Sequence, residues 1–559
     1  MNIKIIPQIG KMVRNLMVIK LKAFVLFLCI SSIAYADTVN PFDKNIQLEE
    51  QKKIFEKFEK SEQQAPIRFD VQKPELLPTE SSEQCIPIKR ITHKNITLLS
   101  EHEVESITQN YLNQCISETT LKNLFNELST LYLNYGYITS RVYIKEQDIS
   151  QGEIELIAIE GKIEAIQSPS SDIALAFDDQ TGEYLNLKDL ETALSIVNRL
   201  PSNSVTMQLI PSESKVGETT ITLDNNRTKP YTFEIGANNF GSDKTGKEQL
   251  SLRLSYDNLL NLNDQISLNL NSTDHHFQNE NSKGNNISYS LPIGTVIYTF
   301  SYTESDYKQQ VPSGTSQYQT DGHTKTYELS ASRELFHNQA HTFNMGAFIS
   351  SYDVETYMSD SLMDTSSYRL SKTGLSLDYT YRSAEFFSFI LIKYIQGTDW
   401  FGNHNPTALD EKYSAFQLDT SIMTSFAPLR YKLNFHGQYS DDQLFNVNQL
   451  SIGGAYSVRG YQSDGLSGNS GYYLRNELSY PSFAKELIPF VDLTPYIALD
   501  TGYIRKEADT DGGRLLSSSV GLQLTKNGFF TDLFYSMPLW KESVQNAKPF
   551  LGLSLSYKY

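Results

Sequence analysis

The last ten residues, 550–559, read FLGLSLSYKY and alternate between two kinds of side chain. Leucine or tyrosine stands at each odd position from 551 to 559, and glycine, serine or lysine stands between them. Successive side chains of a β-strand point to opposite faces of the sheet. The stretch therefore predicts a strand with one apolar, aromatic face and one small or polar face. Tyr557 and Tyr559 give its end the aromatic character of a C-terminal barrel signal.

The same alternation runs back along the chain to Tyr231. It is clearest in residues 250–256, 266–270, 298–302 and 431–435. At about 20 residues per strand and connection, residues 229–559 allow about sixteen antiparallel strands. A soluble β-sandwich also alternates. The polar second face, the aromatic last residue and an N-terminal export signal favour a closed transmembrane β-barrel, which pairs every backbone group without an edge.

The N-terminus has the pattern of a secretory signal peptide. An apolar run, Ala23–Ile33, follows several basic residues and precedes the small-residue site Ala34-Tyr35-Ala36. Cleavage is expected before Asp37, so residues 1–36 form the signal peptide. The alternative is a single anchor helix, but the run is too short to span about 30 Å comfortably. The overall hydrophobic content of 39% is also too low for a bundle of membrane helices.

Charge and cysteine content narrow the partners and the compartment. The formal net charge of −17 argues against a nucleic-acid partner, because phosphate binding needs clustered Lys and Arg. Of the three cysteines, Cys29 lies in the signal peptide. Cys85 and Cys115 then remain in an oxidising compartment, where one disulfide is the natural pairing. Two unpaired buried thiols are the alternative.

Residues 37–228 have mixed composition and divide into four parts. Residues 37–60 predict a short charged helix, or else a flexible charged tail, and residues 61–84 predict a proline-bearing linker. Residues 85–160 and 161–228 predict two successive β-α-α-β-β units. In the first unit Ser100 and Glu103 form a capping box, and Gly136 ends the second helix in the left-handed conformation.

A search for catalytic or cofactor motifs finds one decoy, Gly241–Lys247, with the glycine and lysine spacing of a phosphate-binding loop. Glu248 stands where Ser or Thr must hold magnesium, and an alternating strand follows where a helix is needed. A hairpin turn between the first two barrel strands explains it better. No HExxH, Cys–His cluster or Gly-x-Ser-x-Gly elbow occurs. The sequence implies no catalytic residues, cofactor or metal, and an enzyme is not expected.

The informative motif is Gly453–Tyr461, GGAYSVRGY, in a long interval between two predicted strands. It resembles the Val-Arg-Gly-Tyr signature of the two-partner secretion transporters, the ShlB/FhaC/HecB family of the BamA-like superfamily. Further segments resemble the polypeptide-transport-associated (POTRA) domains of that family, in family order. They are 85–88, 135–141, 147–152 and 160–163 for the first domain, and Asn198-Arg199-Leu200-Pro201 for the second.

The resemblance implies α+β POTRA domains in the periplasm, followed by a transmembrane antiparallel β-barrel in a Gram-negative outer membrane. It implies type V secretion of a large unfolded exoprotein, of haemolysin, adhesin or contact-dependent-inhibition type, which docks on the POTRA domains. Outer-membrane lipids, and the barrel assembly machinery during biogenesis, are the other implied partners. Residues 37–60 would be a lumenal plug. The implied POTRA motif residues are Gly136, Tyr137, Thr139, Ser140 and Arg141.

The implied lumenal motif is Val458, Arg459, Gly460 and Tyr461, in a loop folded into the barrel. A guanidinium there needs a polar lumen and a bidentate acceptor. The family pattern points to an aspartate on a later strand. In the stretch Thr494–Tyr503, period two puts Asp500 on one face with Tyr496, Ala498 and Gly502. Asp500 is therefore the predicted partner. By position alone, Arg459 could be an ordinary exposed loop arginine.

Two other functions compete with secretion. A BamA-like insertase would place barrels into the membrane, but such insertases usually carry more POTRA units than two. A passive porin has no need of the domains at 85–228. The cargo, and whether it is activated during export, cannot be read from the sequence.

Overall fold

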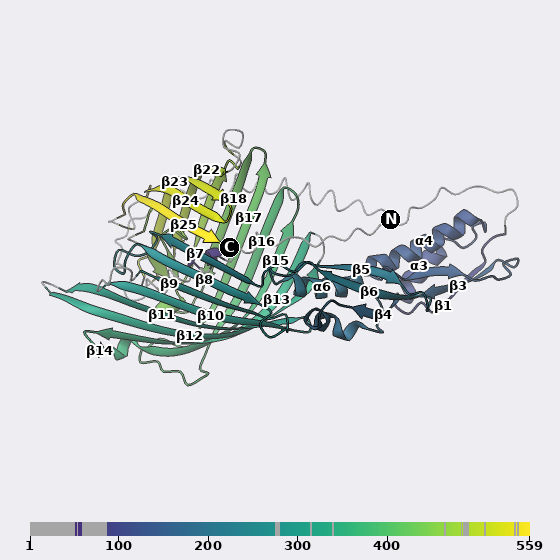
Figure 1. The fold of residues 1–559 in the computed structure, drawn as a ribbon, viewed down its shortest axis with the longest axis horizontal. Coiled ribbons are helices and arrows are strands. Elements are labelled where there is room, and N and C mark those ends of the chain that lie inside the picture. The colour runs from purple at the N-terminus through teal and green to yellow at the C-terminus, as the bar shows by residue number, and fades with distance from the viewer. Residues whose placement is uncertain are drawn as a thin grey trace.

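A computed structural model describes most of the chain beyond residue 85, and six residues before it. The described residues are 51, 52, 54–56, 58, 86–273, 280–313, 316–337, 340–462, 465–481, 483, 491–507, 510–540, 544 and 547–559. The expected signal peptide 1–36, the linker 61–84 and Cys85 lie outside them. Two small α/β units lead in a row to one large barrel (Figure 1).

The first unit packs two helices on a three-stranded sheet of order β1-β3-β2. Its elements are β1 (Arg90–Lys94), α3 (Glu101–Gln109), α4 (Glu118–Tyr135), β2 (Arg141–Ile144) and β3 (Glu153–Ile159). Ser100 caps α3 by accepting from the backbone N–H of Glu103, and Gly136 ends α4 with φ 97°, as the sequence predicts. Buried Leu124, Leu128 and Tyr132 of α4 meet the inner face of β3.

The first strand begins at Arg90, later than the predicted start of the first unit at residue 85. Residues 86–88 instead run along 114–116, where the N–H of Ile88 donates to the Gln114 carbonyl over 2.9 Å and that of Ile116 to the Ile86 carbonyl over 2.8 Å. Because residues 86–88 pair with 114–116, regular pairing with β3 begins beyond them, at Arg90.

The second unit repeats this plan with a shorter first helical layer. It comprises β4 (Lys162–Gln167), α5 (Ser171–Ala174), the 3-10 helix η1 (Leu175–Gln180), α6 (Leu187–Asn198), β5 (Val205–Pro211) and β6 (Glu218–Asn225). The sheet order is β4-β6-β5. Phe177, Leu190 and Leu194 fill its core. The sequence shows no 3.6-residue repeat over α5 and η1, so their position was not predictable.

Sixteen antiparallel strands close the barrel, as predicted, and the last, β25, pairs with the first, β7. The early strands are β7 (Tyr231–Asn238), β8 (Gln249–Asp257), β9 (Gln265–Ser272), β10 (Asn281–Ile293), β11 (Val296–Ser313), β12 (Ser316–His337), β13 (His341–Met358) and β15 (Tyr368–Arg382). The later strands are β16 (Phe386–Thr398), β17 (Ser414–Phe426), β18 (Leu429–Tyr439), β21 (Gly471–Ser479), β22 (Asp492–Ile504), β23 (Gly513–Lys526), β24 (Phe529–Pro538) and β25 (Phe550–Lys558).

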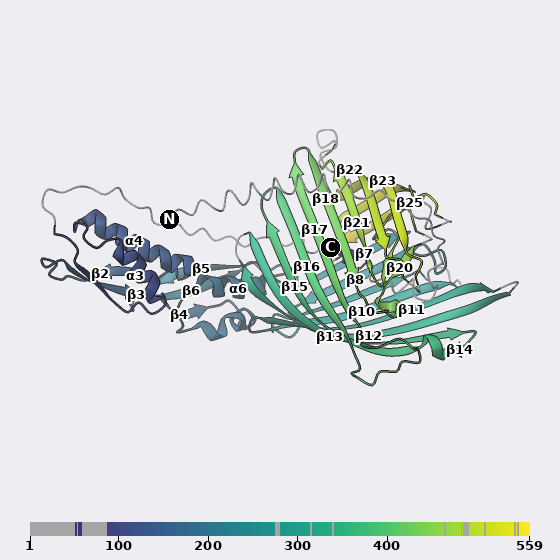
Figure 2. The ribbon, with the colours of Figure 1, turned by 180° about the vertical axis from the view of Figure 1, so that it is seen from behind.

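Smaller elements decorate the barrel. A two-residue strand, β14 (Ser361–Leu362), pairs with β13 and precedes the 3-10 turn η2 (Asp364–Ser366). Strands β11, β12 and β13, of 18, 22 and 18 residues, extend well beyond their neighbours on one side of the barrel (Figure 2). No helix in the described part of the chain is long and apolar enough to cross a membrane.

The predicted two faces of the barrel wall are present at its seam. Leu551, Leu553 and Leu555 of β25 are exposed on the outside, whereas Gly552 is buried. The ring of Phe233 in β7 contacts those of Tyr557 and Tyr559, with centroids 6.1 and 5.3 Å away. The aromatic end of the chain therefore covers the closing seam.

We expect the first unit to lose stability as the pH rises above about 10. Tyr132 is buried and donates to the Glu160 carboxylate over 2.8 Å, and burial followed by this hydrogen bond raises its pKa. Unfolded Tyr132 therefore ionises at a pH where the native side chain stays protonated. This contribution to stability is full below the unfolded pKa and is lost above it.

Tyr132→Phe should make the alkaline loss shallower, and should cost about 1.5–3 kcal/mol at neutral pH because a hydrogen bond to a charged group disappears. Urea unfolding, followed by the circular dichroism signal of the helices, measures the free energy of unfolding at neutral pH and above about pH 10. Tyr143→Phe, on exposed Tyr143 of β2, is the matched control. An unchanged alkaline loss in Tyr132→Phe would refute the role given to Tyr132.

Candidate functional site

The connection between β18 and β21, residues 440–470, folds back into the barrel. It contains the 3-10 turn η3 (Asn446–Asn448) and a hairpin of β19 (Leu450–Ile452) and β20 (Leu466–Gly468). The motif residues Val458, Arg459 and Tyr461 between them are at most 2% exposed. Gly460 has φ 92°, and a Cβ there would lie 3.0 Å from Ser536 Oγ on the wall. Only glycine fits this approach without strain.

Arg459 is held by Asp500 of β22. Its Nε donates to Oδ2 over 2.7 Å, its Nη2 to Oδ1 over 3.0 Å, and its backbone N–H to Oδ2 over 3.2 Å. Asp500 is 0% exposed and lies on the inward face with Tyr496, as the period-two pattern predicts. Arg459 is therefore not an exposed loop arginine.

A second acid and two aromatic rings complete the surroundings of Arg459. Its Nη1 donates to Glu477 Oε2 of β21 over 3.3 Å. The rings of Tyr496 and Phe534 lie 5.7 and 5.8 Å from its Cζ. Bidentate charge-assisted hydrogen bonds offset the desolvation of a buried guanidinium, and removing either partner leaves an uncompensated charge. The tip of the loop is therefore latched to β21 and β22.

The motif's two outer residues fix the loop by packing and by backbone contacts. The Tyr461 hydroxyl donates to the carbonyl of Leu516, over 2.8 Å, and to that of Trp540. Val458 packs against the backbone of Gly502, where a Cβ would lie 3.0 Å from Val458 Cγ2. A side chain at Gly502 would push the loop off β22.

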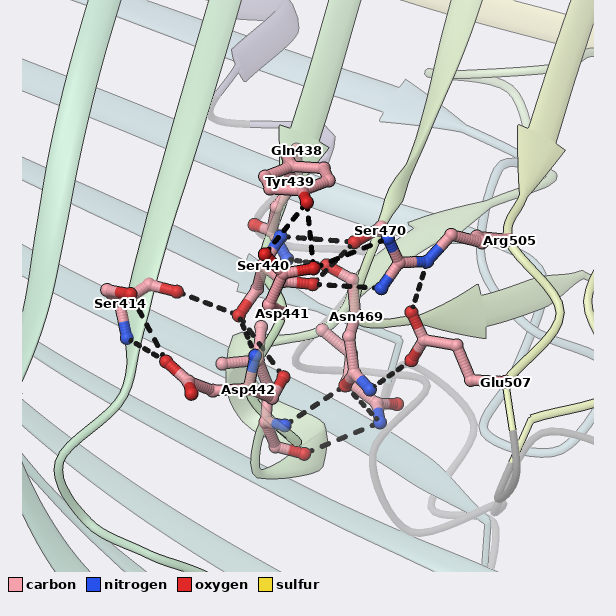
Figure 3. A network of polar contacts seen from close by, with 12 residues as sticks. Ser414, Gln438, Tyr439, Ser440, Asp441, Asp442, Asn469, Ser470, Arg505 and Glu507 are labelled. Carbon is pink, nitrogen blue, oxygen red and sulfur yellow. Dashed lines mark hydrogen bonds and ion pairs between the residues drawn. The ribbon is translucent and has the colours of Figure 1, made fainter.

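A polar network anchors the two arms of the loop at the outer rim (Figure 3). Asn469 donates to Glu507 and accepts from the backbone N–H of Leu444 over 3.0 Å. The Ser440 N–H donates to Ser470 Oγ over 3.0 Å, and Ser470 Oγ donates to the Ser440 carbonyl over 2.8 Å. No local sequence pattern predicts this network, because its members come from segments far apart in the chain.

Gln51 and Phe55 contact this loop from inside the barrel, and the described residues among 51–58 are helical. Gln51 Nε2 donates to the Ser451 carbonyl over 2.8 Å, and Ser457 Oγ donates to Gln51 Oε1 over 3.1 Å. Phe55 lies with its ring centroid 5.8 Å from that of Tyr456.

The same helical residues also reach the barrel wall. The Phe55 ring lies 4.8 Å from the Arg475 guanidinium. Glu56 pairs with Arg253 of β8 over 2.8 Å. Phe58, 1% exposed, packs among Phe387, Phe389 and Leu391 of β16. These residues therefore fill space between the loop and opposite sides of the wall.

The first barrel turn docks on the loop as well. Residues 241–247, the phosphate-loop decoy, form the turn between β7 and β8, where the Gly241 N–H donates to the Lys247 carbonyl over 2.9 Å. Gln462 Nε2 donates to the carbonyls of Phe240 and, over 2.7 Å, of Gly241. The glycines serve a hairpin, as expected. Among the described residues, no group of three possible metal ligands occurs.

The predicted POTRA motif residues gather where the two small units join. They are Gly136, Tyr137, Thr139, Ser140 and Arg141. The Leu187 N–H donates to the Gly136 carbonyl over 2.9 Å, and the Gly161 N–H donates to Ser140 Oγ over 3.0 Å. Arg141 Nη1 donates to the carbonyls of Ile138 and Ser140, both over 2.8 Å.

Close packing restricts this junction further. A Cβ on Gly136 would lie 2.4 Å from Asn186 Oδ1, and one on Gly161 would lie 2.0 Å from Thr139 Oγ1. The Tyr137 ring meets the buried Tyr132 edge-on at 6.4 Å. The motif therefore sets the angle between the two units.

The segment Asn198-Arg199-Leu200-Pro201 lies where the second unit meets the barrel. Arg199 donates to Ser290 Oγ of β10 and to the Asn263 carbonyl, both over 2.7 Å. The Ser202 N–H donates to Asp257 Oδ2 of β8 over 2.9 Å. These buried contacts fasten the unit to the barrel.

Comparison with known proteins identifies the family. The profile of the haemolysin secretion/activation proteins ShlB/FhaC/HecB matches residues 217–524, more than half of the chain. The chain belongs to this family. The profile of the ShlB-type POTRA domain matches residues 86–161, and a general POTRA profile matches 156–211. The two small units are therefore POTRA1 and POTRA2.

Curated relatives cover nearly the whole chain. The outer membrane transporter CdiB of Dickeya dadantii (strain 3937) is 28% identical over 534 residues, which cover 92% of this chain and 95% of the relative. The hemolysin transporter protein HpmB of Proteus mirabilis is 30% identical over 463 residues, covering 79% and 80%. The barrel accordingly lies in the outer membrane, with both POTRA domains in the periplasm.

The solved structure of CdiB from Escherichia coli has the same fold. It superimposes with a TM-score of 0.84 at 24% identity, and the match covers 94% of this chain and 100% of that one. The order of two POTRA domains followed by a closed barrel is thus shared.

We expect Arg459→Ala and Asp500→Ala each to destabilise the barrel by about 3–5 kcal/mol, because each leaves its partner charged and buried. The double variant should cost less than the sum of the two. The guanidinium chloride concentration at which half of the barrel is unfolded in detergent measures the stability of the two single variants and of the double variant. Unfolding is followed by heat-modifiable electrophoretic mobility. The exposed outer pair Arg369–Asp353, at 2.6 Å, is the matched control, with an expected coupling of about 1 kcal/mol or less. Additive losses at Arg459 and Asp500 would show that they do not act as one unit.

Proposed function

We propose that this chain recognises one unfolded partner exoprotein through its POTRA domains and secretes it through the barrel. Family membership across POTRA1, POTRA2 and the barrel supports this, together with the buried pair that holds Arg459 against the inner face of the barrel wall. The cargo would be a large exoprotein of haemolysin, adhesin or contact-dependent-inhibition type.

Docking would use strand edges of the POTRA sheets. Strands β1 and β2 are the edges of the first sheet. In the second sheet β5 is an edge, whereas the start of the other edge strand, β4, is hydrogen-bonded to residues 182–184. Tyr143 on β2 and Ile210 on β5 are 48% and 47% exposed beside these edges. An extended chain can add to such an edge by backbone hydrogen bonds while its side chains meet exposed apolar ones.

The barrel would be closed at rest and open during transport. Residues 37–60 would act as the plug, and 61–84 as its tether. The contacts of Gln51 and Glu56 are polar, so they can be exchanged for water or for the passing chain. Withdrawal of the plug would also have to remove Phe58 from its apolar contact with β16. No nucleotide motif supplies energy, so folding of the exoprotein outside would oppose its return.

Biogenesis adds further expectations. Residues 1–36 would direct export and be removed before Asp37. The aromatic end at Tyr557 and Tyr559 would be recognised by the barrel assembly machinery before insertion among outer-membrane lipids. The protein would carry out this transport without enzymatic chemistry.

Arg459→Ala should lower secretion about tenfold while the barrel stays inserted, because loss of several kcal/mol of pairing depopulates the competent loop position. The assay co-expresses the chain with the exoprotein encoded beside it and measures that exoprotein in the medium and the periplasm. Arg369→Ala, which breaks only the outer surface pair, is the control and should secrete normally. Normal export by Arg459→Ala would remove the role of the latch. Export that is absent even with the unaltered chain would favour a BamA-like insertase.

We also propose a disulfide between Cys85 and Cys115. Supporting it, the backbone of residues 86–88 runs beside 114–116, with Pro87 opposite Cys115. Closing a loop of about 30 residues would stabilise POTRA1 by about 3–4 kcal/mol in the chain-entropy account.

Thiol labelling of the exported, denatured protein tests this pairing. The unaltered chain should show no reactive thiol before reduction, whereas Cys115→Ser should expose Cys85 to the label. Two reactive thiols in the unaltered protein would contradict the disulfide.

A further inference from the structure

The periplasmic turn between β8 and β9, residues 258–264, has its apolar side chains outside. It reads NLLNLND. Leu259, Leu260 and Leu262 are 51%, 58% and 40% exposed, whereas Asn258, Asn263 and Asp264 are at most 5% exposed. Apolar residues normally point inward and polar ones outward. The turn reverses this order.

The reversal is built into the backbone. Asn258, Asn261 and Asn263 all have φ between 57° and 61°, in the left-handed region that asparagine tolerates. Asp264 Oδ1 accepts from the N–H groups of Leu260 and Leu262 over 3.0 and 3.3 Å. The leucines are therefore held on the outside.

The buried side of the same turn holds POTRA2. Asn258 Nδ2 donates to Asp172 Oδ2 over 2.7 Å, and Asn263 Nδ2 donates to the Ile196 carbonyl over 3.0 Å. Arg199 donates to the Asn263 carbonyl on the same side. Whatever the leucines contact therefore constrains POTRA2 as well.

The exposed side continues the lipid-facing surface of the barrel. Tyr256, near the end of β8 and just before the turn, is 41% exposed. Tyr231, which pairs with it on β7, is 45% exposed. Tyrosines in such positions mark the membrane interface. Along the same rim Ile293, at the end of β10, is 61% exposed. Figure 1 shows α6 of POTRA2 beside the periplasmic ends of these strands.

We propose that Leu259, Leu260 and Leu262 insert into the periplasmic phospholipid leaflet of the outer membrane and hold POTRA2 at a fixed angle to the barrel mouth. A contiguous apolar fringe next to an established lipid surface is covered at least cost by lipid. The inference rests on the membrane location of the barrel, and does not depend on which exoprotein is secreted.

Fluorescence quenching in vesicles tests the lipid contact. Both native tryptophans, Trp400 and Trp540, are replaced by Phe, and Leu260→Trp is added to the full chain. In vesicles of brominated phosphatidylcholine its fluorescence should fall about twofold or more relative to unbrominated vesicles, as for a residue at the acyl boundary. Val216→Trp is the control, since Val216 is 87% exposed on the β5–β6 hairpin of POTRA2. Equal quenching at both positions would overturn the proposal.

Two further measurements test the tether and the competing partner. Replacing all three leucines by Ser should leave the barrel inserted but speed tryptic cleavage after Arg227, between POTRA2 and β7, several-fold. Val216→Ser should not. An unchanged rate would overturn the tether. A photo-crosslinker at position 260 that captures the exoprotein, with no lipid quenching, would assign the fringe to polypeptide binding instead.

Discussion

The position of the loop inside the barrel depends on one buried ion pair, Arg459 with Asp500. A guanidinium inside a barrel is stable only where its charge and its N–H groups are met, and Asp500 meets both from a rigid strand. Once Arg459 is fixed, its neighbours along the loop are fixed too. Ser457 donates to Gln51 of the helical residues 51–58, and Gln462 donates to the carbonyl of Gly241 in the turn between β7 and β8. Loop, helix and hairpin thus share one anchor.

Much of this architecture could be predicted because the barrel wall and the POTRA helices have simple periods. The inward face of β22, including Asp500, follows from alternation alone. Alternation also puts Arg475 and Glu477 on one face of β21. It does not predict which side chains lie beside them, because that depends on the register of the neighbouring strands. The rim network at Asn469 and Glu507 joins residues 38 positions apart, and no local pattern encodes that contact. The short α5 and η1 lack a regular period, and residues 86–88 pair with 114–116 before the first strand begins.

The periplasmic half is built as a series of stiff joints. The junction of POTRA1 and POTRA2 uses glycines where a Cβ would collide with the opposite domain. The junction of POTRA2 and barrel uses buried asparagine and arginine hydrogen bonds to backbone carbonyls. Buried polar contacts of this kind are directional, so they specify an angle as well as an affinity. A chain bound along both POTRA sheets would be presented to the barrel in a defined direction.

The unequal lengths of the strands have a consequence for the far side of the membrane. Strand β12 has 22 residues, whereas about 9–11 tilted residues cross a bilayer. About half of β12, and much of its neighbours β11 and β13, therefore extends beyond the lipid as a sheet on one side of the barrel (Figure 2). A polypeptide emerging from the pore would meet this curved sheet on one flank and open water on the other. Its first folded turns would form against a ready-made β surface, so the exit is not symmetric about the pore axis.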